Sequence, residues 1–407
     1  MGNSSTSLIQ AFDFASPGFV TFDASALEHF TDDNTVHVLA WVYVNSRDMP
    51  DDQKVFSVPN MLTLGTSATT GNKPVLYPEV WDAKGNRYTF ESGEIPTDQW
   101  ALIEIIWTRG GSLVGFVNGV KVQQSVPVSS HPIAPPSKDA NGHLVAYVGN
   151  LWNGSHPFAG MVQSVLMTNA ADFSATEACA VTPSRAISNS GGSDCDFHGG
   201  AKKAFSKPPS TPYGKQSDPP APERIGEEMP QEVTAGPTFQ MVVPSTDNAT
   251  YTMLSVAQSW KNLYELTGER YVDTGRDVSV TTGVSATDSE TETLGASLGV
   301  EAGADFLDLL TTKINLTLSY SESFTETFTV TEQVTTTDHF AINKPPQTMT
   351  CVWWQAVPTF STFQVIKGKA PKSASVESPG SVVYPQTFPP DHTQYARATD
   401  AALSAKG

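Results

Sequence analysis

Residues 293–331 read TLGASLGVEAGADFLDLLTTKINLTLSYSESFTETFTVT, and this segment contains the most informative residue pattern of the C-terminal half. Seven of the nine even positions from 314 to 330 are apolar, whereas every odd position from 315 to 337 carries an uncharged polar residue. Alternation with a period of two predicts a β-strand with one apolar and one polar face. Since strands of globular proteins are usually about 5–6 residues long, a strand of this length indicates an unusual architecture.

A second alternating segment lies immediately upstream. The even positions of 294–304 are apolar and the odd positions of 293–305 are small or polar, which predicts an antiparallel partner strand. The residues between the two strands, 305–310, read DFLDLL and contain four large apolar side chains, Phe306, Leu307, Leu309 and Leu310. Because turns of soluble hairpins are polar, an apolar tip predicts that this turn anchors in or crosses lipid.

The two segments have a suitable length for a membrane. Residues 294–304 and 312–322 each cover 11 positions, and a tilted transmembrane strand needs about 9–11 residues. We therefore predict an insertion hairpin at about 290–330, whose lipid-facing side chains are Leu294, Leu298, Val300, Ile314, Leu316, Leu318 and Tyr320. The predicted lumen-facing side chains are Ser297, Glu301, Asp305, Lys313, Asn315, Thr317 and Ser319. Because two strands cannot close a barrel, several protomers must contribute one hairpin each, which predicts a homo-oligomer on the target membrane.

The C-terminal half resembles the aerolysin and epsilon-toxin family of β-pore-forming proteins over about 240–370. The segments that carry the resemblance are 281–289, GASLGVEAG at 295–303, the apolar tip, the Ser/Thr strand to Thr337, Pro345-Pro346 and 349–354. The resemblance implies an elongated antiparallel β domain. It also implies a soluble protomer that binds a surface receptor, assembles into a ring and refolds an amphipathic loop into a transmembrane β-barrel.

Residues 8–180 read as many short strands separated by turns. The clearest strands are expected at 19–22, 36–44, 100–107, 114–117 and 144–148, with turn signals such as Asn118-Gly119 between them. No long helical period intervenes, which is typical of a β-sandwich. The expected fold class is therefore mainly β, with an N-terminal sandwich and a second, elongated β domain.

The N-terminal part resembles the laminin-G and concanavalin-like jelly roll. The carriers are FVNGV at 116–120, FAGMV at 158–162 and the segment 173–179. The resemblance implies a binding module, often for glycans, in which aromatic side chains stack on sugar rings. Trp41 and Trp107 lie inside apolar strands and are expected in the core, whereas Trp81 and Trp152 lie near turns and are the candidate glycan-binding residues.

Composition suggests four segments along the chain. We predict a glycan- or receptor-binding sandwich at 1–185, a Pro/Gly/Ser-rich linker at 186–238, a pore-forming domain at 239–370 and a Pro/Ser-rich tail at 371–407. A short helix is expected at 256–266, where apolar residues share one helical face and Gly268 follows.

The net charge bears on which classes of partner the protein can bind, and the cysteines bear on possible disulfide pairing. The net charge of −18 and the absence of a basic stripe argue against nucleic-acid binding. An acidic chain is also repelled by anionic lipids, so membrane docking is expected to need a specific receptor or a non-charged contact, and the expected receptor is a glycan. Cys179 and Cys195 could pair in an exported protein, or all three cysteines, with Cys351, could stay reduced. Without a classical signal peptide, the protein is expected to be secreted or released by another route.

Enzymatic alternatives are weakly supported by the sequence. GASLG at 295–299 matches the G-x-S-x-G motif, but it lies in an alternating strand instead of a strand–turn–helix elbow. Glu79, Glu91, Glu94 and Glu104 form no ordered cluster, and DCDFH at 194–198 is interpreted as a flexible loop. We therefore expect no catalytic site, no cofactor and no metal. The predicted function is a β-pore-forming cytolysin, and the alternative is a non-lytic carbohydrate-binding protein with a β-rich stalk.

Overall fold

The computed structural model describes residues 8–14, 17–46, 51–68, 73–139, 141–206, 230–234, 239–243, 249–285, 289–299, 318–319, 327–328, 330–381 and 383–388. The fold is mainly β, with antiparallel pairing throughout the named strands, which confirms the predicted class. The chain forms two compact units. The first, here called the sandwich unit, comprises Met1–Thr211, Phe239–Ser255 and Ser361–Ala374. The second, here called the long-strand unit, comprises Pro212–Thr238, Val256–Phe360 and Ser375–Gly407.

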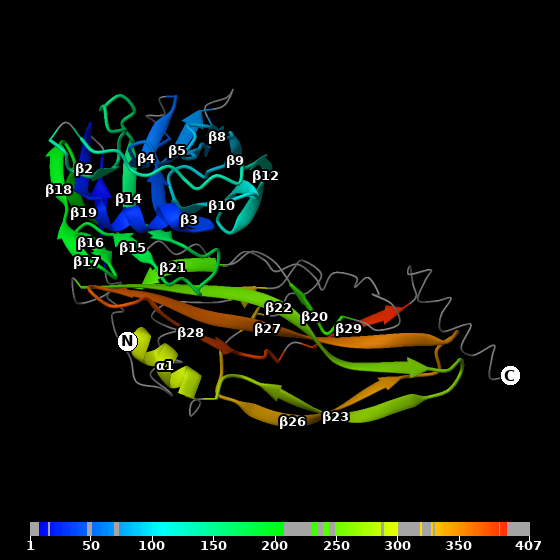
Figure 1. The fold of residues 1–407 in the computed structure, drawn as a ribbon. Helices are drawn as coiled ribbons and strands as arrows, with labels where there is room; N and C mark the ends of the chain where they lie inside the picture. The colour runs from blue at the N-terminus through cyan, green and yellow to red at the C-terminus, as the bar shows by residue number, and fades with distance from the viewer. Residues whose placement is uncertain are drawn as a thin grey trace. The chain divides into compact units, whose positions relative to one another are not determined.

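The sandwich unit contains two antiparallel sheets, drawn from blue to green in Figure 1. The order of the first sheet is β12-β11-β10-β3-β14-β15-β16-β17, with β1 joined to β14 and β19 joined to β1. Its strands are β1 (Ile9–Asp13), β3 (Thr35–Val44), β10 (Trp100–Thr108), β11 (Ser112–Val117), β12 (Val120–Pro127), β14 (Gly160–Thr168), β15 (Ala178–Val181), β16 (Arg185–Ser188), β17 (Gly191–Asp194) and β19 (Lys202–Ser206).

The second sheet has the order β18-β2-β13-β4-β5-β6-β9, with β7 joined to β5 and β8 joined to β7. Its strands are β2 (Gly18–Asp23), β4 (Gln53–Val58), β5 (Leu62–Ala68), β6 (Pro74–Leu76), β7 (Glu79–Trp81), β8 (Arg87–Thr89), β9 (Ser92–Glu94), β13 (Val145–Val148) and β18 (Asp196–Gly199). A 3₁₀ helix, η1 (Ser25–Asp32), follows β2. The chain passes from the first sheet to the second at Cys195, between β17 and β18.

The core of the sandwich follows from the alternation of its strands. On β3 the even positions from Val36 to Val44 belong to the central hydrophobic cluster, together with Phe56 of β4 and Trp107 of β10. Trp41 is also only 1% exposed although it lies at an odd position of β3, so both faces of this strand are buried. The expectation that Trp41 and Trp107 are core residues is confirmed.

Segments from the C-terminal half complete the sandwich unit. The hydroxyl groups of Tyr251 and Ser164 are 3.4 Å apart, and the ring of Phe363 lies 5.9 Å from that of Phe173. The amide of Gly368 donates a hydrogen bond to the carbonyl of Ser188. The compact unit therefore extends beyond residues 1–185 and includes 239–255 and 361–374.

The linker prediction is wrong for residues 186–206. They form most of β16 and all of β17, β18 and β19, which extend both sheets of the sandwich. Glycine and serine in this segment suggested an irregular chain, but backbone pairing with neighbouring strands overrides composition. The flexible loop predicted at 194–198 is also wrong, because this segment comprises the end of β17, Cys195 and most of β18. Among the described residues, no group of three or more potential ligands could hold a metal ion.

A third sheet contains the longest strands, β22 (Thr250–Gly268) and β27 (Met349–Ile366), which run side by side in Figure 1. Its order is β20-β22-β27-β28, with β21 joined to β22 and β29 joined to β27. The shorter strands are β20 (Glu232–Thr234), β21 (Phe239–Val243), β28 (Lys372–Glu377) and β29 (Val383–Phe388). The helix expected at 256–266 is wrong, because this segment is the middle of β22 and its Trp260 pairs with Val233. Tertiary pairing has overridden a weak helical pattern.

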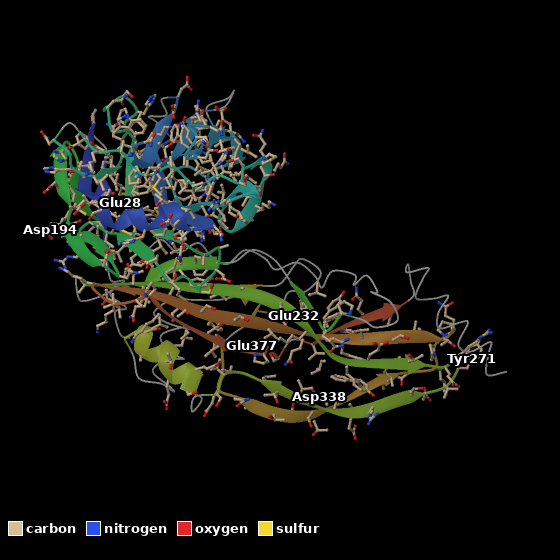
Figure 2. All side chains as sticks on the ribbon, in the orientation of Figure 1. Glu28, Asp194, Glu232, Tyr271, Asp338 and Glu377 are labelled. Carbon is tan, nitrogen blue, oxygen red and sulfur yellow. The ribbon has the colours of Figure 1, made fainter. Side chains whose placement is uncertain are left out.

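Strands β23 (Thr274–Thr282) and β26 (Val334–Ile342) form a separate antiparallel ladder in the long-strand unit. Phe340 of β26 stacks on Trp353 of β27 with ring centroids 5.0 Å apart. The buried amide of Gln355 donates hydrogen bonds to the carbonyl oxygens of Thr281 and Gly380. Figure 2 labels Asp338 on β26 and Tyr271 at the turn that follows β22. These contacts fix the ladder against the long strands.

The predicted strand at 294–304 is contradicted at its beginning. Residues Ser289–Ser297 form helix α1, in which Thr291 and Leu294 are buried, and Leu298 just after it is also buried. Side chains three and four residues apart share one helical face, and Glu290 and Glu292 in the first turn favour the helix by interacting with its dipole. A period-two pattern therefore coexists with a helix in this state of the protein.

Most other positions of the predicted hairpin lie outside the described residues. These are Phe306, Leu307, Leu309 and Leu310 at the tip, Val300, Ile314, Leu316 and Tyr320 on the expected lipid face, and Glu301, Asp305, Lys313, Asn315 and Thr317 on the expected lumen face. Leu318 and Ser319 form β24 (Leu318–Ser319), which pairs with β25 (Thr327–Phe328). None of the described helices has the length and apolar character needed to cross a membrane.

Candidate functional site

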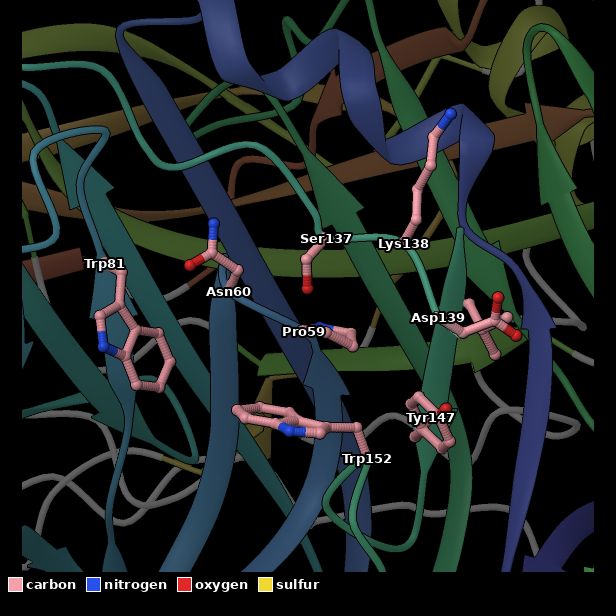
Figure 3. A pocket seen from close by; sticks show the side chains of 9 residues that line it. Pro59, Asn60, Trp81, Ser137, Lys138, Asp139, Tyr147 and Trp152 are labelled. Atoms are coloured by element: carbon pink, nitrogen blue, oxygen red, sulfur yellow. The ribbon is translucent and has the colours of Figure 1, made fainter. Parts of the chain in front are cut away.

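A pocket of about 590 Å³ opens on the second sheet of the sandwich. Figure 3 shows its lining: Pro59, Asn60, Trp81, Ser137, Lys138, Asp139, Val145, Tyr147 and Trp152. These residues come from the turn between β4 and β5, the end of β7, the long connection before β13, β13 itself and the loop that follows it. The pocket therefore gathers residues that are up to about 90 positions apart in the sequence.

Strand alternation directs the aromatic side chains into this pocket. Ala146 and Val148 of β13 belong to the core, so Tyr147 between them faces outward. Trp81 follows the core residue Val80 on β7 and also faces outward. The rings of Trp81 and Trp152 meet edge to face with centroids 6.4 Å apart, and Trp152 is 39% exposed. The two tryptophans that the sequence singled out therefore lie together in one site.

Polar groups line the pocket beside the rings. The side chain of Asn60 donates a hydrogen bond to the carbonyl of Pro135, and the amide of Ser137 donates one to the carbonyl of Pro59. The backbone amides of His143 and Asn141 donate to the Asp139 carboxylate and lower the pKa of that group. Partial burial, together with the negative charge of Asp139, raises the pKa of Tyr147. At neutral pH the site therefore presents an ionised carboxylate and a protonated phenol.

A buried carboxylate, that of Asp82, stabilises the turn that follows Trp81. This turn adjoins the wall of the pocket that Trp81 forms. The carboxylate of Asp82, which is 1% exposed, accepts hydrogen bonds from the backbone amides of Lys84 and Asn86 and from the side chains of Asn86, Tyr88 and Ser129. Burial acts to raise the pKa of Asp82, but these hydrogen bonds outweigh it and lower the pKa below its ordinary value of 3.8. The backbone of Trp81 also pairs with Met61 and Ala134. The wall is thus fixed before any ligand binds.

We expect Asp82→Asn to destabilise the sandwich unit by about 2 kcal/mol, because an amide would place an N–H group against the donors of Tyr88 and Ser129. Since folding lowers the pKa of Asp82, the wild-type advantage is fully present above pH 3.8 and declines as the pH falls below it. Urea unfolding at about pH 7 and about pH 3 measures both effects. Asp23→Asn, at an exposed carboxylate that accepts one amide hydrogen bond, is the matched control. Equal midpoints for the Asp82 variant and the wild type at neutral pH would contradict this assignment.

Glu79 lies on the same strand and the same face as Trp81, but it belongs to a cluster of ion pairs. Its carboxylate contacts the buried ammonium of Lys54 at 2.8 Å and the guanidinium of Arg87. Burial acts to raise the pKa of Glu79, but the hydrogen bond and charge of Lys54 and the charge of Arg87 lower it. Glu104 lies on the other sheet, 3.1 Å from His37. The structure therefore does not bring these two carboxylates together.

Sequence reasoning missed several residues of the pocket. Tyr147 could have been found, because it sits at an outward position of the expected strand 144–148. Asn60, Ser137 and Asp139 come from separate connections, and nothing in the sequence indicates that these connections meet. Ser297 of the G-x-S-x-G motif is the last residue of α1, and its hydroxyl donates a hydrogen bond to the carbonyl of Leu294.

A family model described as the Concanavalin A-like lectin/glucanases superfamily matches residues 17–177, which is less than half of the chain. This match supports the jelly-roll prediction for the N-terminal part. The aerolysin-like character of the C-terminal part stays a prediction. No curated protein matches this chain.

Several solved structures are similar to parts of the chain. A heptameric SAP-like pentraxin from Limulus polyphemus is 13% identical, with 40% of this chain and 77% of that chain covered and a TM-score of 0.31. Domain 4 of an extracellular arabinanase from Geobacillus stearothermophilus, in complex with arabinotriose, is 19% identical, with coverages of 33% and 60% and a TM-score of 0.23. The oligomeric pore-forming toxin pro-Monalysin is 14% identical, with coverages of 39% and 71% and a TM-score of 0.22. These similarities are too distant to identify a function.

Proposed function

We propose that this protein binds a surface glycan through the pocket of Trp81 and Trp152 and then permeabilises the underlying membrane with the 290–330 hairpin. The observation that carries the first step is the pocket itself. It combines two tryptophan rings and Tyr147 with an amide, a hydroxyl and a carboxylate on a pre-formed wall. The proposal includes no catalysis and no cofactor, and it assumes a protein that is secreted or released.

The chemistry of the lining favours a carbohydrate. The C–H faces of a sugar ring pack on aromatic rings, and its hydroxyl groups exchange hydrogen bonds with polar side chains such as those of Asn60 and Ser137. Asp139 and the net charge of −18 disfavour a strongly anionic glycan. A neutral glycan is therefore the proposed receptor. Binding of the full chain to an array of neutral and acidic oligosaccharides tests this step, and an absence of binding across the array would contradict it.

The register of the β23–β26 ladder supports the second step. Thr282 pairs with Val334 at the end of the ladder. If β23 and β26 continued past this end in the same register, each advancing by one residue at a time, the two strands would meet between Leu307 and Leu309. That position is the centre of the apolar tip identified from the sequence. Two independent observations, the register of the described strands and the composition of the tip, therefore favour the same turn.

The same continuation would also match the two faces. In this register Leu298 would lie opposite Leu318, and Ser297 would lie opposite Ser319. Cross-strand neighbours on one face interact directly, and a shift of one residue would place apolar side chains against polar ones. The proposed inserted hairpin thus has an apolar face for lipid from the Ala296/Tyr320 pair to the Ala302/Ile314 pair, and a polar face for the lumen on the alternate positions. Several protomers would each supply one hairpin to close the barrel.

Insertion would require three described features to rearrange. The bridge between Val284 and Glu332, just beyond the ladder, is parallel and would be replaced by antiparallel pairing. Helix α1 would unwind, because residues 294–297 become strand in the hairpin. The β24–β25 pair would separate, because Leu318 now pairs with Phe328 and would pair instead with Leu298. The protomer described here is therefore assigned to the state before insertion.

A cysteine scan tests the proposed faces. After Cys179, Cys195 and Cys351 are replaced by alanine, a polarity-sensitive dye is attached to single cysteines and its emission is measured on receptor-bearing vesicles. We expect a lipid signal from positions Leu298, Val300, Leu316 and Leu318, and a water signal from positions Ser297, Gly299, Thr317 and Ser319. The cause is the period of two, which sends adjacent side chains to opposite faces. A dye pattern without this period would reject the hairpin.

The second candidate function is a non-lytic carbohydrate-binding protein with a β-rich stalk. The family match at 17–177 and the pocket favour glycan binding without requiring insertion. Release of an encapsulated dye from glycan-bearing vesicles separates the two functions. Binding without release would support the non-lytic protein.

A further inference from the structure

A row of rings lies beside the pocket on the same face of the second sheet. Tyr147 lines the pocket, and its ring centroid is 5.8 Å from that of Phe19 on β2. Phe19 in turn stacks on His198 of β18, with centroids 4.7 Å apart and planes inclined by 21°. The rings therefore form a continuous aromatic surface that starts at the pocket and runs to the edge of the sheet.

The strand register explains this alignment. Thr21 of β2 pairs with Tyr147 on one side and with Asp196 on the other, and Phe19 pairs with His198. Val20 of the same strand is buried in the core, so Phe19 and Thr21 face outward. Strand register and alternation together place one ring on each of the three adjacent strands β13, β2 and β18.

The row is accessible and carries polar groups. His198 is exposed, whereas Phe19, Thr21 and Tyr147 are half-buried. The hydroxyl oxygen of Thr21 lies 2.8 Å from Nε2 of His198. The Thr21 hydroxyl and the imidazole nitrogens therefore add hydrogen-bonding groups to this row, as Asn60 and Ser137 do beside the tryptophans. Both parts of this face combine stacking surfaces with hydrogen-bonding groups.

We propose that the glycan site extends from the pocket across β13, β2 and β18, and that Phe19 and His198 form a distal subsite for a linear oligosaccharide. This inference rests on the proposed glycan binding and adds the class of ligand to it. The strand order from β7 to β18 spans five strand intervals, or about 24 Å at about 4.8 Å per interval. A single sugar fills only the pocket, whereas a chain of several sugars reaches the distal subsite.

Length-dependent binding tests the inference with the full-length protein. The probes are neutral cello-, xylo- and chito-oligosaccharides, each from the monosaccharide to the hexasaccharide, and affinity is measured by titration calorimetry. We expect wild-type affinity for the preferred series to rise with chain length. His198→Ala and Phe19→Ala should each weaken hexasaccharide binding about tenfold, as expected for the loss of one stacking ring, and should leave binding of the shortest ligand unchanged.

Two control variants distinguish the loss of the distal subsite from a general loss of structure. Phe19→Tyr keeps the ring and should keep hexasaccharide affinity within about twofold of wild type. Phe205→Ala removes a ring that is 67% exposed on β19 of the other sheet, and it should have no effect. Hexasaccharide affinity that is unchanged in His198→Ala and Phe19→Ala, while Trp152→Ala reduces it, would overturn the distal subsite and leave the pocket intact. A wild-type protein that binds none of the probes would overturn both the pocket and the subsite.

Discussion

Replacing Trp152 with alanine is expected to weaken oligosaccharide binding by ten- to a hundredfold, and replacing Trp81 as well is expected to abolish it. Loss of one aromatic stacking partner costs about 1–3 kcal/mol for a nucleic-acid base, and we expect a comparable loss for a sugar ring. Each 1.4 kcal/mol changes affinity about tenfold. Trp152 is 39% exposed and contacts Trp81 across the pocket, so its removal takes away ligand surface without emptying the core. Titration of the oligosaccharide that binds best to the wild type measures the effect.

The matched controls for this prediction lie elsewhere on the chain. Tyr271 is an exposed aromatic residue in the long-strand unit, so Tyr271→Ala should bind the oligosaccharide as the wild type does. Trp152→Phe retains a ring and should lose only part of the affinity. If Trp152→Ala and Tyr271→Ala bind equally well, the pocket is not the glycan site.

A disulfide between cysteines placed at Leu318 and Phe328 is expected to block dye release from receptor-bearing vesicles completely. These positions pair in the described β24–β25 register, and that register is incompatible with the proposed hairpin, in which Leu318 lies opposite Leu298. A covalent link would therefore hold the protein in the state before insertion. Addition of a reducing agent should restore dye release, which shows that the protein itself is intact.

The control disulfide joins two residues that are paired in the described state and would stay paired in the proposed inserted state. Thr281 and Thr335 pair in the β23–β26 ladder with hydroxyl oxygens 3.0 Å apart. Cysteines at these two positions can form a disulfide without opposing the proposed hairpin, so this variant should release dye under oxidising and reducing conditions alike. Both variants need a background without the three native cysteines. Full release from the oxidised Leu318/Phe328 variant would show that insertion does not require this rearrangement.

Some errors of sequence interpretation have a common physical cause. The segment 256–266 had a helical pattern but is strand, and the segment 289–297 lies at the edge of an alternating pattern but is helix. Both patterns are short, and local preferences of this kind amount to less than about 1 kcal/mol per residue. Pairing with β20 and β27 decides the first segment, and burial of Thr291 and Leu294 on one helical face decides the second.

Alternation and turn residues are local signals, and they were sufficient to predict the β class, the sandwich pattern of the N-terminal part and the burial of Trp41 and Trp107. The sequence also distinguished Trp81 and Trp152 from the core tryptophans, since both lie near turns. The 6.4 Å contact between these two rings, and their grouping with Asn60, Ser137 and Asp139 in one pocket, could be seen only in the folded protein. Only the tertiary structure set Phe19 and His198 beside the pocket, because strand order and register arise from long-range pairing that no local stretch of residues encodes.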